Sequence, residues 1–137
     1  MSIAEIMHED VVTVEPSTLI NDAITTMEVH GIRHLPVLDD GRIVGMVSDR
    51  DLREYQTPLS EALARPKEAQ HRLLSPVSEA MATDIVFVDR EEDIQKAVDT
   101  MLHYNIGAVP VVDRSTLSLV GMVSYVDILR LFRDTTV

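Results

Sequence analysis

The sequence contains no cysteine and no tryptophan, and aromatic residues make up only 4% of its 137 residues. Without cysteine the chain has no disulfide framework, no thiol nucleophile and no thiolate zinc site, so redox chemistry does not indicate a compartment. The amino-terminal residues lack the basic and apolar regions of a secretory signal, and no apolar run reaches membrane-spanning length. We therefore expect a soluble cytoplasmic protein.

Basic residues are also scarce. Lys and Arg number 12 against 23 Asp and Glu, which gives a formal net charge of −11. Nucleic acid polymers and anionic membrane surfaces are therefore disfavoured as main partners, because both require a basic surface. The hydrophobic share of 45% is sufficient for a core, and the length fits one domain or two small ones.

The chain contains an internal repeat. One constant shift places residues of the first half on identical residues of the second, and a shift two residues longer places residues 44–48 on 120–124. The matched pairs are Glu5 with Glu79, Met7 with Met81, Asp10 with Asp84, Val12 with Val86, Ile20 with Ile94, Met27 with Met101, Pro36 with Pro110 and Asp51 with Asp127.

Each repeat is predicted to be β-α-β-β-α. The β-branched runs 11–14 and 85–88 indicate strands, and each precedes apolar residues at helical spacing. These helices should end at Gly31 and Asn105, the residue types that best tolerate the left-handed conformation. Two short strands at 35–38 and 43–47 should form a hairpin through an Asp-Gly turn. A final helix should follow Ser48 and Ser124, each suited to cap it.

The expected organisation is a first repeat at 1–53, a partly helical connector at 54–75 and a second repeat at 76–137. Short helices at 2–7 and 78–81 should open the repeats, and Ser2 with Glu5 has capping-box spacing. The stretch 59–63 is predicted to form one or two helical turns. About sixty residues are marginal alone, so the two repeats should pack face to face as one unit.

Two motifs occur in both repeats: an apolar-Pro-apolar strand at 35–37 and 109–111, and a Gly-apolar-apolar-Ser-x-x-Asp ending at 45–51 and 121–127. With these motifs the tandem repeat resembles the CBS-domain pair, or Bateman module. The resemblance covers nearly the whole chain. It implies an α+β fold, with two β-α-β-β-α repeats packed as one pseudo-two-fold module.

The Ser-x-x-Asp motif has two interpretations. A serine at a strand-to-helix junction can meet a phosphate with its hydroxyl and the free helix N–H groups, and an Asp one turn later can accept both hydroxyls of a ribose. Alternatively, Ser is a plain N-cap and Asp stabilises the helix dipole. Two copies inside a CBS-like repeat favour the ligand interpretation.

The resemblance further implies that adenine nucleotides bind in the cleft between the repeats, with Ser and Asp from one copy and the adenine and phosphate contacts from the other. The residues implied for the first site are Met7, Val12, Ile32, Arg33, His34, Pro36, Met122, Ser124 and Asp127. Those implied for the second site are Met46, Ser48, Asp51, Met81, Val86, Ile106, Gly107, Ala108 and Pro110.

The two sites differ at the two residues that precede the apolar-Pro-apolar strand, where the resemblance implies phosphate contacts. Arg33 and His34 offer cationic or hydrogen-bonding side chains, whereas Gly107 and Ala108 offer none. The first site is therefore predicted to bind a phosphorylated ligand more tightly. The alternatives are a solvated Arg33 and a His34 that faces water from an edge strand.

The leading hypothesis is a non-catalytic regulatory module that senses cellular energy by binding AMP, ADP, ATP or a related adenosyl ligand. The alternative is a ligand-free module for homodimerisation or docking on a regulated protein. The five histidines lack metal-ligand spacing, and no nucleophile-base pair or P-loop is present, so we expect no metal, no cofactor and no enzymatic activity.

Overall fold

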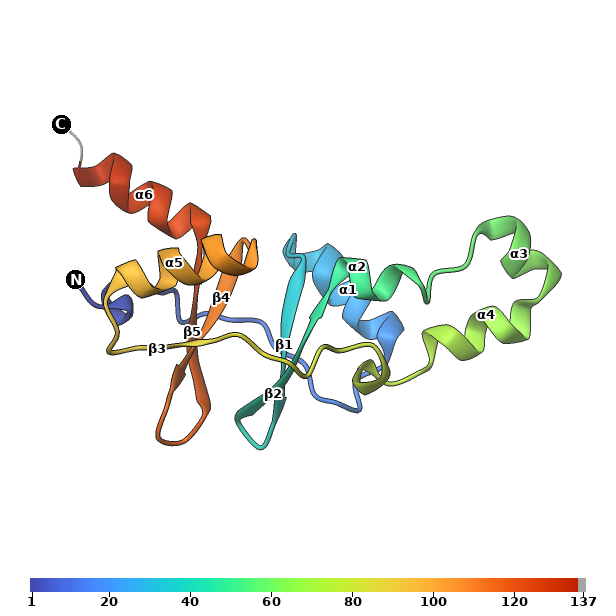
Figure 1. Cartoon of the computed structure of the whole chain (residues 1–137). Coiled ribbons are helices and arrows are strands. Elements are labelled where there is room, and N and C mark those ends of the chain that lie inside the picture. The colour runs from blue at the N-terminus through green and yellow to red at the C-terminus, as the bar shows by residue number, and fades with distance from the viewer. Residues whose placement is uncertain (136–137) are drawn as a thin grey trace. The chain divides into compact units, whose positions relative to one another are not determined.

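The computed structural model describes residues 1–135, which form an α+β fold (Figure 1). The chain divides into two compact units, each with its own hydrophobic core. Unit 1 contains residues 1–11 together with the chain from Val86 onward, and unit 2 contains residues 12–85. The last two residues of the second predicted repeat, 136–137, lie outside the described residues.

Unit 2 contains a β-hairpin, helices and one short 3-10 helix, η2. Its elements are α1 (Ile20–His30), β1 (His34–Asp39), β2 (Arg42–Ser48), α2 (Asp49–Arg53), α3 (Leu59–Ala64), α4 (Pro66–Leu73) and η2 (Val77–Glu79). Helix α3 corresponds to the helical turns predicted at 59–63, and α4 begins at Pro66, a residue that is favoured in the first turn of a helix.

Unit 1 has the same order of a helix, a two-stranded hairpin and a second helix. Its elements are η1 (Ile3–Glu5), β3 (Val88–Asp89), α5 (Ile94–Tyr104), β4 (Ala108–Asp113), β5 (Ser118–Ser124) and α6 (Tyr125–Thr135). Strand β4 pairs antiparallel with β5 and parallel with the short β3. The helices predicted at 2–7 and 78–81 are three-residue 3-10 helices, and the predicted capping box is present at Ser2 and Glu5.

The predicted turns and helix ends are confirmed. Asp40 and Gly41, with φ of 54° and 78°, form the turn between β1 and β2, as expected for an Asp-Gly hairpin. Gly31 ends α1 with φ of 62°, and Asn105 ends α5 with φ of 54°. Both residues take the left-handed conformation that stops a helix.

The strands predicted at 11–14 and 85–88 are wrong for their first three residues. Val14 alone pairs in its run: its N–H donates to Pro36 O and its C=O accepts from Leu38 N–H. A parallel strand would next require an N–H at position 36, which proline lacks. Pro110 occupies the same place in β4, so β3 is likewise limited to Val88 and Asp89.

The opening segment of each sequence repeat packs with the body of the other repeat. Ile3, which is fully buried, belongs to the core of unit 1, and its N–H donates to Glu92 O over 2.8 Å. Val77 is fully buried in unit 2, where its N–H donates to Thr18 O over 2.7 Å. The repeat shows that these segments are equivalent, but it carries no information on which core each one fills.

Candidate functional site

The two Ser-x-x-Asp motifs form reciprocal caps at the start of α2 and of α6. In unit 2 the Ser48 N–H donates to Asp51 Oδ2 over 2.9 Å, and the Asp51 N–H donates to Ser48 Oγ over 3.2 Å. In unit 1 the corresponding distances between Ser124 and Asp127 are 2.8 Å and 3.3 Å. Both serine caps are therefore formed, and they hold the two carboxylates in a similar orientation relative to their helices. Each carboxylate keeps further acceptor capacity, so capping and ligand binding are compatible roles for the pair.

A glycine precedes each motif because another segment lies directly on the strand. A Cβ on Gly121 would lie 2.8 Å from His8 O and 2.8 Å from Met7 Sδ. A Cβ on Gly45 would collide with Met81 Sδ and lie 3.1 Å from Ala82 O. The segments that approach these glycines so closely are the chain's own opening segments.

These segments pair with the strands through two backbone hydrogen bonds each. The His8 N–H donates to Met122 O over 3.0 Å, and the Met122 N–H donates to His8 O over 2.9 Å. Ala82 and Met46 make the same pair in unit 2, at 2.8 Å and 2.9 Å. His8 and Ala82 therefore occupy equivalent backbone positions.

His8 adds an interaction that the sequence interpretation missed. Its Nδ1 lies 3.0 Å from Asp127 Oδ2, the carboxylate expected to bind ribose. No histidine stands at the equivalent position in unit 2, since that residue is Ala82. The repeat alignment contained a signal, the unequal pair His8 and Ala82, but only the backbone pairing shows that position 8 reaches Asp127.

The residues predicted for the two nucleotide sites are distributed over both units. Unit 1 holds Met7, Met122, Ser124 and Asp127 of the first site, and Val86, Ile106, Gly107, Ala108 and Pro110 of the second. Unit 2 holds Met46, Ser48, Asp51 and Met81 of the second site, and Val12, Ile32, Arg33, His34 and Pro36 of the first. Within a unit, the Ser-Asp pair and the methionine of the opening segment flank the same strand.

The apolar residues predicted to hold adenine are partly buried. Val12, Ile32 and Met81 pack against the core of unit 2, and Met7, Val86 and Ile106 pack against the core of unit 1. Pro36 and Pro110 are buried on β1 and β4 and pair with Met46 and Met122. Part of each of the six packing side chains remains accessible, so these residues combine a core role with a surface that a ligand can contact.

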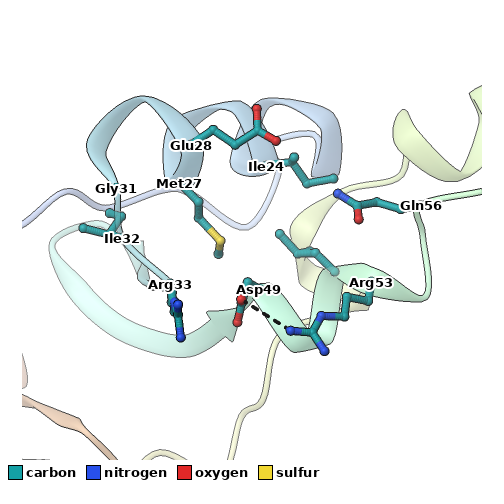
Figure 2. Close-up of a pocket in the computed structure, with 10 residues that line it drawn as sticks. Ile24, Met27, Glu28, Gly31, Ile32, Arg33, Asp49, Arg53 and Gln56 are labelled. Carbon is teal, nitrogen blue, oxygen red and sulfur yellow. Dashed lines mark ion pairs between the residues drawn. The ribbon is translucent and has the colours of Figure 1, made fainter.

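The side chains of Arg33 and His34 are exposed. Arg33 lines a pocket of about 460 Å³ between α1 and α2, and its C=O accepts the Asp49 N–H over 2.9 Å (Figure 2). In this pocket Arg53 lies 3.8 Å from the Asp49 carboxylate. The pocket is lined by the apolar residues Ile24, Met27 and Leu52 and by charged side chains. Arg33 is thus available to an anion at its guanidinium.

Residues 1–135 contain no group of three or more His, Cys, Asp or Glu side chains placed to hold a metal ion. Within the same residues, every helix is too short or too polar to cross a membrane.

Comparison with known proteins identifies the family. The family model described as "CBS domain" matches residues 3–64 and 77–134. The CBS domain-containing protein YhcV of Bacillus subtilis is 31% identical over 127 residues, which cover 93% of this chain and 82% of YhcV. Protein MJ1225 of Methanocaldococcus jannaschii is 30% identical, and the match covers 98% of this chain and 49% of MJ1225. This chain therefore spans about half the length of MJ1225.

Solved structures agree. The crystal structure of MJ1225 matches with a TM-score of 0.83 and 26% identity, over 96% of this chain and 47% of that one. The CBS domain pair of protein MJ0100, solved in complex with 5′-methylthioadenosine and S-adenosyl-L-methionine, matches with a TM-score of 0.76 and 28% identity, over 99% and 98% of the two chains. The resemblance inferred from the two repeated motifs is confirmed: this chain belongs to the CBS-domain family.

Proposed function

We propose that this chain is a non-catalytic regulatory module that binds an adenosyl ligand. The ligand is AMP, ADP, ATP or a related molecule such as S-adenosylmethionine. Its binding residues are the two sets that the repeated motifs predict, each built around one Ser-Asp pair. Ligand binding regulates in one of two ways. The ligand binds one conformation of the chain more tightly than another, or a protein partner binds the ligand-bound and free chains with different affinity.

One observation carries this proposal. The Ser-Asp pair occurs twice, and in both copies the serine N–H donates to the aspartate carboxylate. In both copies an equivalent opening segment is hydrogen-bonded to the strand that leads into the pair. The proposal is supported by the match along almost the whole chain to the CBS pair of MJ0100, which was solved in complex with 5′-methylthioadenosine and S-adenosyl-L-methionine. Capping explains each Ser-Asp pair, but it does not require the partly exposed methionine that each opening segment places against the same strand.

The chemistry of each group fits a part of the ligand. An ionised carboxylate only accepts hydrogen bonds, so Asp51 and Asp127 suit the two hydroxyl donors of a ribose. The accessible apolar surface of Met7, Val12 and Ile32 suits the faces of an adenine ring. Arg33 offers a planar guanidinium that can bind a phosphate with two parallel hydrogen bonds.

The first site should be the tighter one for a phosphorylated ligand. It contains Arg33 and His34, whereas the equivalent residues of the second site are Gly107 and Ala108. For a ligand without phosphate this advantage is absent.

Isothermal titration of AMP, ATP and S-adenosylmethionine into the purified chain tests the proposal. Asp51→Ala and Asp127→Ala should each remove one binding event, and the double variant should bind none of the ligands. Asp134→Ala is the matched control, because it removes an exposed carboxylate from the same helix as Asp127. The proposal fails if millimolar ligand gives the wild type neither heat nor a thermal shift.

A second candidate function is homodimerisation through unit 1. Helices α5 and α6 contact each other and expose large apolar side chains: Leu102 is 75% exposed, Leu129 60% and Tyr104 54%. Exposed apolar residues on adjacent elements are typical of protein interfaces. Analytical ultracentrifugation should find a dimer that Leu102→Glu with Leu129→Glu converts to a monomer. A monomeric wild type at micromolar concentration would exclude this function.

A further inference from the structure

We propose that His8 holds the Asp127 carboxylate in the free chain and that the ribose of an incoming ligand must displace it. His8 is then a competing residue, which weakens binding at the Asp127 site and leaves the Asp51 site unaffected. This inference rests on the proposed adenosyl-binding function and adds to it a built-in difference between the two sites.

The hydrogen bonds of Asp127 show why there is competition. Oδ2 accepts from Ser124 N–H at 2.8 Å, from Ser124 Oγ at 3.1 Å and interacts with His8 Nδ1 at 3.0 Å. Because a carboxylate cannot donate, Nδ1 must carry the proton in this pair. Three donors therefore share Asp127 Oδ2, whereas Asp127 Oδ1 has no hydrogen-bond partner among residues 1–135. The two adjacent hydroxyls of a ribose match the two oxygens of one carboxylate side by side, with one hydroxyl to each oxygen, so Oδ2 has to release a donor.

The backbone fixes where the His8 side chain begins, but its end can move. The two backbone hydrogen bonds with Met122 hold position 8 beside β5. The side chain of His8 is 46% exposed, whereas that of Asp127 is only 15% exposed. Displacement by a ligand therefore requires a rotation of His8 toward solvent, without any change in the strand or the helix.

Unit 2 supplies the comparison within the same chain. Ala82 makes the same backbone pair with Met46 that His8 makes with Met122, and its methyl group has no donor. In the described part of the chain, Asp51 has side-chain hydrogen bonds with Ser48 only. The Asp51 carboxylate thus accepts the backbone N–H of its serine, as Asp127 does, but it has no competing imidazole.

The test uses one site at a time and ligands that differ only in the ribose hydroxyls. In the Asp51→Ala background, which retains the Asp127 site, titrations with AMP and with 2′,3′-dideoxyadenosine 5′-monophosphate are compared before and after His8→Ala. The substitution should tighten AMP binding about two- to fivefold, the range expected for one partly exposed hydrogen bond. Binding of the dideoxy nucleotide should not change. If S-adenosylmethionine is the tighter ligand, 5′-methylthioadenosine and its dideoxy counterpart replace this pair.

The reverse substitution is the matched control. In the Asp127→Ala background, Ala82→His should weaken AMP binding at the Asp51 site by a similar factor and again leave the dideoxy nucleotide unaffected. Circular dichroism and thermal melting establish that each variant is folded.

The outcomes separate this inference from the proposed function. A chain that binds no adenosyl ligand, with or without His8, overturns both. A chain that binds AMP, but in which His8→Ala weakens AMP, leaves it unchanged or tightens both nucleotides equally, overturns only the role of His8.

Discussion

His8 Nδ1 lies 3.0 Å from Asp127 Oδ2, although the two residues stand near opposite ends of the chain. The contact exists because residues 1–11 pack with the second repeat rather than with the first. It places an imidazole on the carboxylate that we propose to bind ribose. The equivalent contact is absent in unit 2, so two repeats of similar sequence carry chemically different carboxylates.

Removing a serine cap should destabilise the chain without abolishing the fold. Ser48→Ala and Ser124→Ala each remove the side-chain acceptor for an Asp N–H, and loss of such a cap costs about 1 kcal/mol. Urea denaturation measures the change, with Ser17→Ala as an exposed control. Equal stabilities of all three variants and the wild type would show that neither cap contributes.

The glycines under the opening segments should tolerate alanine unequally. Gly121→Ala places a Cβ 2.8 Å from the backbone oxygen of His8, which cannot move without breaking its pair with Met122. At Gly45 the nearest atom is the end of the flexible Met81 side chain. We expect Gly121→Ala to cost about 1–3 kcal/mol and Gly45→Ala less, with a lower melting temperature in that order.

Gly107→Ala is the control for this pair, because its Cβ would meet only Tyr125 at an ordinary 3.4 Å. A melting temperature for Gly107→Ala as low as that of Gly121→Ala would contradict the close-approach argument.

The two left-handed helix ends should respond in opposite directions. Gly31→Ala puts a Cβ on a residue with φ of 62° and should destabilise the chain by about 1 kcal/mol. Asn105→Gly relieves the same strain at φ of 54° and should be neutral or slightly stabilising. Thermal melting of both variants checks this, and a stabilised Gly31→Ala would contradict it.

Acid should remove a contribution of Asp89 to stability. The Glu91 N–H and the Arg114 N–H donate to its carboxylate over 2.9 Å and 2.8 Å, and these two bonds hold its pKa below the ordinary value. A carboxyl whose pKa is lowered by folding stabilises the fold above its unfolded pKa of about 3.9, and this contribution is lost as the pH falls through the folded-state pKa.

Asp89→Asn should therefore lower the free energy of unfolding at pH 7 and have a smaller effect near pH 3. Urea denaturation of the variant and the wild type at both pH values measures the difference in their free energies of unfolding. The contributions of the other carboxyl groups are common to both proteins and cancel in this difference. An equal effect at the two pH values would show that the charge of Asp89 contributes nothing.

Local features were predictable from the sequence because they depend on nearby residues. Gly31, Asn105 and the Asp40-Gly41 turn each have a conformational preference that holds in any fold. The Ser-x-x-Asp caps span a single helical turn, so their spacing alone gives the geometry. The family also followed, because two motifs were repeated in order along the chain.

Features that depend on distant partners were not predictable. The strands at 11–14 and 85–88 satisfy β-propensity, but their pairing stops where Pro36 and Pro110 offer no N–H. Ile3 and Val77 fill cores of the opposite repeat, a choice that the repeat itself leaves open. The interaction of His8 with Asp127 follows from that exchange, so it was missed for the same reason.

Titration of adenosyl ligands into the wild type and the Asp51→Ala/Asp127→Ala double variant tests the binding function without an intermediate step. We expect saturable binding of AMP, ATP or S-adenosylmethionine by the wild type and its loss in the folded double variant. Binding that survives the double substitution would contradict the assignment of the two carboxylates. No binding by the wild type at millimolar ligand would contradict the function itself.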